Sequence, residues 1–126
     1  MNANLEKLLK MAEVTTTKNI VIRDNFIMYK NGDSGFYPLA KIYDKYIEVL
    51  WLELNDIEMD LYVRRDNRGN YDWLTRFSYV NLNETEMKIY AKTLHDTIFK
   101  NYKMAKAVSV ARNAFWETYY AVMEGK

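Results

Sequence analysis

The chain contains no cysteine among its 126 residues. Disulfide bonds and metal sites built on thiolates are therefore excluded, and we expect a protein that works in the reducing cytoplasm. A run of about 20 apolar residues, which a helix needs to cross a bilayer, is also missing. The N-terminal segment lacks the uninterrupted apolar stretch of a signal peptide, so we expect no membrane association.

An excess of charge of either sign is lacking as well. The chain has 18 Lys and Arg residues against 17 Asp and Glu residues, which gives a formal net charge of +1. A DNA mimic would be strongly acidic, and a protein that binds DNA regardless of sequence would be strongly basic. The overall charge thus indicates neither class. The length and the ordinary apolar content predict one globular domain that spans residues 1–126.

Motifs of catalysis, metal binding and phosphate binding are absent too. The only histidine, His95, is followed by Asp96, which points about 100° away on a helix and cannot orient the imidazole. The four glycines form no phosphate-binding loop, and no serine lies in a nucleophile elbow. We therefore expect no enzyme, no cofactor and no metal ion, and we interpret His95 as a surface or half-buried helix residue.

Five carboxylates surround one predicted turn of the chain. Two interpretations fit them: a site for a divalent cation or for acid–base catalysis, or the solvated side of a hairpin. The alternation of apolar and polar residues favours the second, because one side of such a hairpin faces water. The five residues are Glu48, Glu53, Asp56, Glu58 and Asp60.

What the sequence does contain is a long helical pattern from Asn83 to Glu124. Asn83 is a favoured N-cap, and Glu86 three positions later completes a capping-box pattern. Gly125 is a natural helix stop. Between these ends, apolar residues recur every three or four positions without a break in phase. They are Met87, Tyr90, Ala91, Leu94, Ile98, Tyr102, Ala105, Val108, Ala111, Phe115, Tyr119 and Met123.

A single helix of this length conflicts with the size of the chain. It would measure about 63 Å at 1.5 Å per residue, whereas a compact chain of this length has a diameter of roughly 35 Å. The helix must therefore break, for which we favour residues 100–103, or project beyond the sheet. We expect its end to pack back on the sheet after a kink, as part of the core, or to meet a partner. Left in water, that end would expose a large aromatic surface, made of Phe115, Trp116, Tyr119, Tyr120 and Met123.

The rest of the chain predicts a short helix and a sheet. Residues 4–14 show helical periodicity, and β-rich segments with turn signals between them follow up to residue 80. Consecutive strands joined by short loops favour antiparallel pairing. The predicted fold class is α+β: a short N-terminal helix, an antiparallel meander sheet of about five strands, and a long C-terminal helix or helix pair packed on one face. The clearest strand segments are residues 20–22, 26–29, 46–54, 57–63 and 71–80.

Three short signals lie in the first half of this sheet. Asp24-Asn25 indicates a tight turn or a bulge. Asn31-Gly32 is a stronger turn signal, because these residues tolerate the positive φ angles that a hairpin needs. The only proline, Pro38, indicates an edge strand or the start of a strand.

Four of the six arginines lie in one predicted hairpin, residues 62–77, which we call the arginine hairpin. Guanidinium groups bind carboxylates and phosphates, and aromatic rings offer stacking surfaces. The segment is therefore a candidate contact site for a protein, a nucleic acid or a nucleotide. In the alternative interpretation Arg64, Arg68 and Arg76 are solvated while Trp73 and Phe77 fill the core. The candidate contact residues are Arg64, Arg65, Arg68, Arg76 and Tyr71.

Tyrosine is abundant, with eleven residues, and tyrosine-rich surfaces suit recognition. In size and in its content of Tyr and Asn, the chain is similar to small phage proteins of low-GC bacteria that carry no enzyme motif. Inhibitors of CRISPR nucleases and of other host defence systems are among them. The resemblance implies a small non-enzymatic interaction protein of anti-CRISPR-like type. It rests on size and composition and carries over no site residue.

Three functions follow as hypotheses. The favoured one is a small non-enzymatic interaction protein, for example an inhibitor of a host defence protein such as a CRISPR nuclease, which binds its partner directly through the arginine hairpin and through Trp116 and Tyr120 at the end of the last helix. The alternative is a nucleotide or nucleic-acid binding protein that uses the same hairpin. The third is a purely structural oligomer built on the helix that begins at Asn83, and the length of this helix favours a homodimer.

Overall fold

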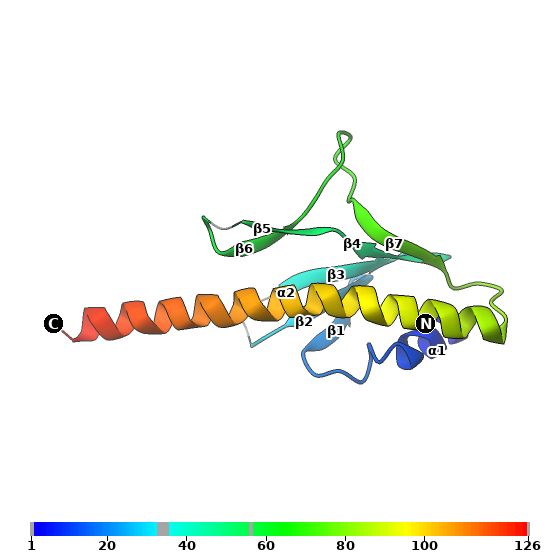
Figure 1. The fold of residues 1–126 in the computed structure, drawn as a ribbon, viewed down its shortest axis with the longest axis horizontal. Helices are drawn as coiled ribbons and strands as arrows, with labels where there is room; N and C mark the ends of the chain where they lie inside the picture. Colours follow the sequence, from blue (N-terminus) through cyan, green and yellow to red (C-terminus); the bar gives the residue numbers. More distant parts are fainter. Residues whose placement is uncertain (1, 33–35, 56, 126) are drawn as a thin grey trace.

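The computed structural model describes residues 2–32, 36–55 and 57–125. It confirms the α+β fold class: a short N-terminal helix, an antiparallel sheet and one long C-terminal helix packed against it (Figure 1). The elements in chain order are α1 (Ala3–Met11), β1 (Ile20–Arg23), β2 (Phe26–Lys30), β3 (Phe36–Ile42), β4 (Tyr46–Leu50), β5 (Leu52–Asn55), β6 (Asp60–Val63), β7 (Trp73–Ser78) and α2 (Glu84–Glu124).

The main sheet has five strands in the order β1-β2-β3-β4-β7, and all neighbours are antiparallel. The predicted strand 46–54 is in fact two strands, interrupted at Trp51. Its first half, β4, pairs with β3 and β7, whereas its second half, β5, leaves the sheet and forms a separate two-stranded hairpin with β6. The meander prediction thus holds for the main sheet, and the β5–β6 hairpin is an addition to it.

The turns follow the chemistry of their residues. Asp24 and Asn25 have φ angles of +52° and +64° and connect Arg23 directly to its partner Phe26, so the prediction of a tight turn is confirmed. Gly32, with φ of +64°, lies between the antiparallel strands β2 and β3, while residues 33–35 fall outside the described part of the chain.

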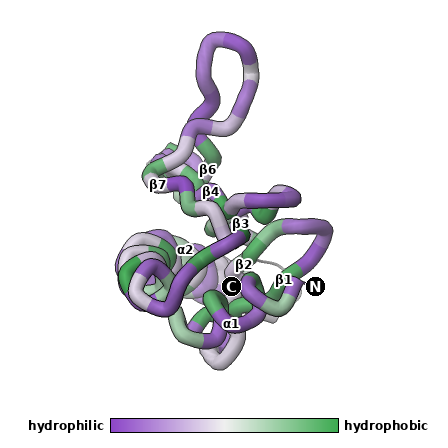
Figure 2. The backbone as a smooth tube through the Cα atoms, turned by 90° about the vertical axis from the view of Figure 1, so that its right-hand side faces the viewer, coloured by the Kyte–Doolittle hydropathy of each residue, from purple (hydrophilic) through white to green (hydrophobic). Residues whose placement is uncertain are grey.

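Both helices cover the same side of the sheet. Leu5, Leu8 and Leu9 of α1 pack with inward-facing residues of the strands and with the first half of α2. Figure 2 shows both helices on one side of the sheet, while the loop that leads into β7 rises from the opposite side. The core is therefore shared by the helices and one sheet face, which leaves the other face open for contacts.

Pro38 lies in the half of β3 that has only one neighbour. It pairs with Met28 of β2, whereas β4 begins to pair with β3 only at Ala40. Proline lacks an N–H donor and is tolerated where a strand has an unpaired edge. The predicted edge position is therefore correct locally, although β3 is the third of five strands.

Asn101 of α2 fills the point where β3 and β4 separate. Its side-chain amide donates hydrogen bonds to the carbonyl oxygens of Leu39 (3.0 Å) and Leu50 (2.8 Å). Both carbonyls lie just beyond the last paired residues of the two strands, Ala40 and Val49. Asn101 is 1 % exposed, so it satisfies two buried acceptors that the ladder leaves open.

The long helix α2 is continuous from Glu84 to Glu124. The predicted capping box is confirmed: the Asn83 side chain accepts from the Glu86 N–H at 2.8 Å, and Glu86 Oε1 accepts from the Asn83 N–H at 3.1 Å. The predicted kink at residues 100–103 is wrong. The polar residue Asn101 does not break the helix, because its side chain is buried and forms hydrogen bonds to the sheet.

A helix that is both long enough and apolar enough to cross a membrane does not occur in residues 2–32, 36–55 and 57–125.

Candidate protein-binding surfaces

The first candidate surface is the free end of α2. The side of α2 that is buried on the sheet includes Leu94, Ile98, Ala105 and Val108. At 100° per residue the same side continues, in phase, into the C-terminal residues of the helix. We call these continuing residues, together with the adjacent Tyr120, the aromatic stripe. They are Phe115 (52 % exposed), Trp116 (45 %), Tyr119 (45 %), Tyr120 (57 %) and Met123 (48 %).

The contacts of α2 with the rest of the fold stop near Arg112. Its guanidinium Nη1 lies 3.2 Å from Asp60 Oδ2 of β6, and one turn earlier the Ser109 hydroxyl accepts from the Asn31 amide at 2.9 Å. Every residue from Asn113 to Gly125 is exposed, and the helix extends past the strands (Figure 1). The expectation that this end packs back into the core is therefore wrong, since the helix projects.

The rings of the aromatic stripe contact one another. The Trp116 ring lies 5.3 Å from Phe115, 5.6 Å from Tyr119 and 6.0 Å from Tyr120, measured between centroids. Two of these contacts are edge-on, an arrangement that aromatic quadrupoles favour. The rings shield each other only in part, so the stripe remains a contiguous apolar surface in water.

The second candidate surface is the arginine hairpin. The prediction that its two strands pair with each other is wrong, because β6 pairs with β5 and β7 pairs with β4, and only residues 64–72 fold back on themselves, through a bridge between Arg65 and Tyr71. Arg64 stacks on the Trp51 ring at 4.4 Å, and its Nε lies 3.1 Å from Asp72 and 3.9 Å from Glu53. Arg64 is thus neutralised by carboxylates of its own hairpin and of β5. As a contact residue it would have to exchange these partners.

Arg65 and Arg68 keep more of their binding capacity. Arg65 stacks on Tyr71 at 4.4 Å and donates one hydrogen bond to the Gly69 carbonyl at 2.8 Å. Within the described residues, neither guanidinium forms an ion pair. The Asp66 carboxylate is bound to the backbone N–H groups of Arg68 and Asn70, so it orders the loop rather than neutralising either arginine.

Arg76 is the most firmly held of the four. Its Nε and Nη2 donate to the carboxylate of Glu48, which is 3 % exposed, and its guanidinium lies between the rings of Tyr46 (4.8 Å) and Trp73 (4.7 Å). A buried carboxylate needs such a partner. Arg76 therefore has a structural role as well as a place on the surface.

Trp73 does not fill the core, as one interpretation assumed, because it is 43 % exposed on the face opposite α2. The register between β4 and β7 shifts by one residue, so that Val49 faces Thr75 but Leu50 faces Trp73. Such a bulge moves the side chains beyond it to the other face of the sheet. Phe77 lies on the other side of the bulge from Trp73, and it is buried as expected.

Arg65, Arg76 and Tyr71 meet at a pocket of about 500 Å³ on the open face of the sheet, which we call the outer-face pocket. Four further members come from β3, β4 and the turn between them, and the sequence did not place them beside the arginine hairpin, although it marked Glu48 as a candidate carboxylate. Burial and then the negative charge of Glu48 raise the pKa of Tyr43 to about 12, so this hydroxyl stays protonated at neutral pH. These additional members are Lys41, Tyr43, Tyr46 and Glu48.

The predicted site residues thus fall into two separate surfaces. Trp116 and Tyr120 belong to the projecting end of α2, whereas the arginine hairpin stands on the open side of the sheet, at another extremity of the molecule (Figure 1). A single contact patch that contains both sets is not formed.

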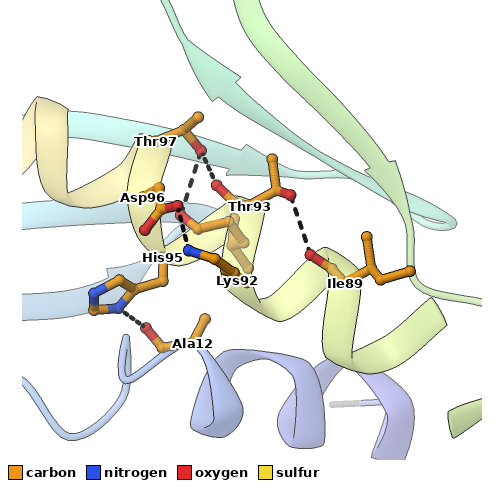
Figure 3. Close-up of polar contacts among 8 residues, drawn as sticks. Ala12, Ile89, Lys92, Thr93, His95, Asp96 and Thr97 are labelled. Atoms are coloured by element: carbon orange, nitrogen blue, oxygen red, sulfur yellow. Dashed lines mark hydrogen bonds and ion pairs between the residues drawn. The ribbon is translucent and has the colours of Figure 1, made fainter. Parts of the chain in front are cut away.

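His95 packs between α1 and α2. Its Nδ1 donates a hydrogen bond to the Ala12 carbonyl at 2.9 Å, and Asp96 forms an ion pair with Lys92 at 3.2 Å instead of orienting the imidazole (Figure 3). The interpretation of His95 as a half-buried helix residue is confirmed. Its hydrogen bond fastens α2 to the end of α1.

The candidate carboxylates are dispersed. Glu48 is bound to Arg76, Glu53 accepts from the Tyr62 hydroxyl at 2.8 Å, and Asp60 pairs with Arg112. Asp56 lies outside the described residues. In the part of the chain that the structure describes, three or more His, Asp or Glu side chains do not come together as a metal site.

Comparison of the chain with family models, curated proteins and solved structures finds no match in any of the three.

Proposed function

We propose that this chain is a non-enzymatic protein-binding protein whose principal contact is the aromatic stripe of α2. The observation that carries the proposal is the continuation of the buried side of α2 into a segment that no part of the described fold covers. Aromatic residues and Met are enriched at the centres of protein interfaces, and charged residues are depleted there. The stripe contains no charged residue.

The exposed area supports an interface of useful size. A half-exposed aromatic side chain presents on the order of 100 Å², so the four rings present roughly 400 Å² of mostly apolar surface. At about 25 cal/mol per Å², covering them would stabilise a complex by about 10 kcal/mol before the costs of association. A partner surface that covers the stripe would therefore gain more than a scattered apolar residue could supply.

The partner we propose is a host protein that the chain inhibits, such as a nuclease of a bacterial defence system. This finer proposal comes from the resemblance to small phage inhibitors. Such an inhibitor would act in the cytoplasm by direct binding, without turnover.

A pull-down from a bacterial host lysate tests the proposal when stripe and control variants are compared. The stripe variant is Trp116→Ala with Tyr120→Ala. The matched control is Ile89→Ala with Val110→Ala, since both residues are exposed on α2 but point away from the stripe. We expect a stoichiometric protein partner that wild type and control retain and that the stripe variant binds at least tenfold more weakly. A partner that all three proteins bind equally would contradict the proposed contact.

We also propose that a second copy of the chain can bind the same stripe and form a homodimer. A twofold dimer places the same patch of both copies in contact, and an apolar stripe free of charge does not repel its own copy. Light scattering at increasing protein concentration measures this directly. Dimer formation by the wild type and loss of the dimer in the stripe variant are the expected results, whereas a monomer at high micromolar concentration would leave only the heterologous partner.

Nucleotide or nucleic-acid binding by the arginine hairpin is the second candidate function. Its support is that Arg65 and Arg68 form no ion pair among the described residues and that Tyr71 offers a stacking ring. Phosphate contacts would make the affinity fall steeply with salt. A titration with single-stranded oligonucleotides at two salt concentrations tests this, and binding that is absent or insensitive to salt would remove the candidate.

A further inference from the structure

The outer-face pocket is built around a row of side chains that crosses four strands. In register from β2 to β7 the row consists of Phe26, Lys41, Glu48 and Arg76. Side chains directly opposite each other on neighbouring strands lie about 5 Å apart and interact. The row therefore places a buried carboxylate between two cations, and its formal charge is +1.

Only one of these two cations neutralises Glu48. Arg76 binds the carboxylate through two N–H groups, whereas Lys41 forms no ion pair in the part of the chain that the structure describes. The Lys41 ammonium instead lies over aromatic rings, 4.8 Å from the centroid of Tyr43 and 5.6 Å from that of Tyr71. It is thus placed by ring contacts and keeps donors for an external anion.

Arg65 approaches the same Tyr71 ring, at 4.4 Å. Of its five N–H donors, one is used by the Gly69 carbonyl. Two cations that have no carboxylate partner among the described residues therefore contact the same ring, Tyr71, in the lining of the pocket. An anion that contacts both cations would offset the repulsion between them.

The carboxylates that line the pocket are already occupied. Glu48 is bound by Arg76, Asp72 lies 3.1 Å from Arg64, and Asp66 accepts from two backbone N–H groups of its loop. The lining thus contains three cationic groups, Lys41, Arg65 and Arg76, and three carboxylates, Glu48, Asp66 and Asp72, so its formal charge is zero. A lining without net charge disfavours a chain of closely spaced phosphates, while the remaining donors of Lys41 and Arg65 can bind one or two carboxylates.

We propose that the outer-face pocket binds an acidic side chain of a partner protein, whose carboxylate is held between Lys41 and Arg65. The rings of Tyr71 and Trp73 then pack against the apolar or aromatic neighbours of that acidic residue. This site is separate from the aromatic stripe and does not depend on the proposed function of the stripe.

The test is a titration of the isotope-labelled full chain with a capped peptide of glutamate and tyrosine, followed by the amide signals of each residue. The same peptide with glutamine in place of glutamate, and a single-stranded oligothymidylate, serve as comparison ligands. We expect the acidic peptide to shift signals around Lys41, Arg65 and Tyr71, and to bind at least tenfold more tightly than the glutamine peptide.

Variants of the chain show which residues bind the peptide. Lys41→Gln with Arg65→Gln should weaken peptide binding at least tenfold, whereas Lys88→Gln with Lys92→Gln removes the same charge from an exposed part of α2 and should change it less than twofold. The stripe variant Trp116→Ala with Tyr120→Ala should bind the peptide as the wild type does. Equal binding of both peptides, tighter binding of the oligothymidylate, or no shift in the wild type at about 1 mM peptide would overturn the proposal.

Discussion

Asn101 shows how much of the fold depends on one polar side chain. Its amide bonds carbonyl groups that lie 62 and 51 positions away in the sequence. In the sequence the same residue stands in a polar run and looks like a helix break. Periodicity describes only the helix to which a residue belongs, whereas the two acceptors come from strands that separate elsewhere, so this role could not be predicted.

We expect Asn101→Ala to destabilise the protein by about 3 kcal/mol, because two buried carbonyl groups lose their donors. For a chain of this length that corresponds to a decrease in Tm of about 10 °C. Thermal denaturation followed by circular dichroism measures the change. Asn113→Ala, at an exposed position of the same helix, is the matched control and should leave Tm nearly unchanged.

Arg76 and Glu48 form a pair whose members should not be removed singly. Arg76→Met leaves the buried Glu48 carboxylate without its partner and should cost about 3 kcal/mol. Adding Glu48→Gln to that variant should restore about 1 kcal/mol or more, because the unpaired charge is gone. Chemical denaturation of the single and double variants gives the comparison. A double variant less stable than Arg76→Met alone would contradict this account.

Tyr43 gives the stability of the protein a dependence on alkaline pH. Its pKa is raised to about 12, above the value of about 10 for an unfolded chain. The folded state therefore holds this proton more tightly, so the contribution is fully present below pH about 10 and is lost as the pH rises through about 12. We expect Tyr43→Phe to show a weaker loss of stability over this interval in unfolding experiments at a series of pH values. An identical pH profile in both proteins would show that Tyr43 does not contribute.

Among the elements, the bounds of α2 are predicted best from the sequence, whereas the position of its C-terminal end is predicted worst. The capping box, the apolar period and the stop at Gly125 are local signals, and all three hold in the structure. Whether the part of α2 beyond Arg112 packs on the fold depends on whether the sheet extends beneath it, and no local sequence pattern indicates that. Similarly, the apolar run of residues 46–54 does not reveal that β4 and β5 separate at Trp51, because apolar residues continue through it without a turn signal.

Removal of residues 114–126 should leave the folded core intact. The described residues beyond Asn113 are exposed, so few contacts with the domain are lost. We expect the free energy of unfolding to change by less than about 1 kcal/mol, while binding through the aromatic stripe disappears. Denaturation and pull-down of the same truncated protein test both statements. A truncated chain that fails to fold would show that the end of α2 stabilises the domain.

At the scale of the whole molecule, only some of the proposed contact residues can be identified from the sequence. The arginine hairpin could be found because its residues are neighbours along the chain. Lys41 and Glu48 join it only through the register of β3 and β4, and Tyr46 comes from the start of β4. Register depends on the assembled sheet and on a bulge in β7, so the complete outer-face pocket could not be predicted from one sequence.

The two surfaces should act independently, because they lie at different extremities of the fold (Figure 1). Changes that are far apart and share no contacts usually add in free energy. A protein that combines Lys41→Gln and Arg65→Gln with Trp116→Ala and Tyr120→Ala should therefore lose binding free energy equal to the sum of the two double variants. Calorimetric titration of a common partner measures this, and a clear departure from the sum would indicate that one partner segment touches both surfaces.

The unbroken course of α2 also fixes the direction in which a bound partner faces. Because the helix is continuous, the rotational position of the stripe around the helix axis is fixed relative to the sheet. One alanine inserted after Asn113 would turn the stripe by about 100° around the helix axis, whereas seven inserted residues would restore its azimuth to within about 20° and move it about 10 Å outward. An inhibitor that must block a particular cleft of its target would lose its effect with the one-residue insertion while it still binds. Binding depends on the residues of the stripe, whereas blocking the cleft depends on the rotational position of the stripe around the helix axis.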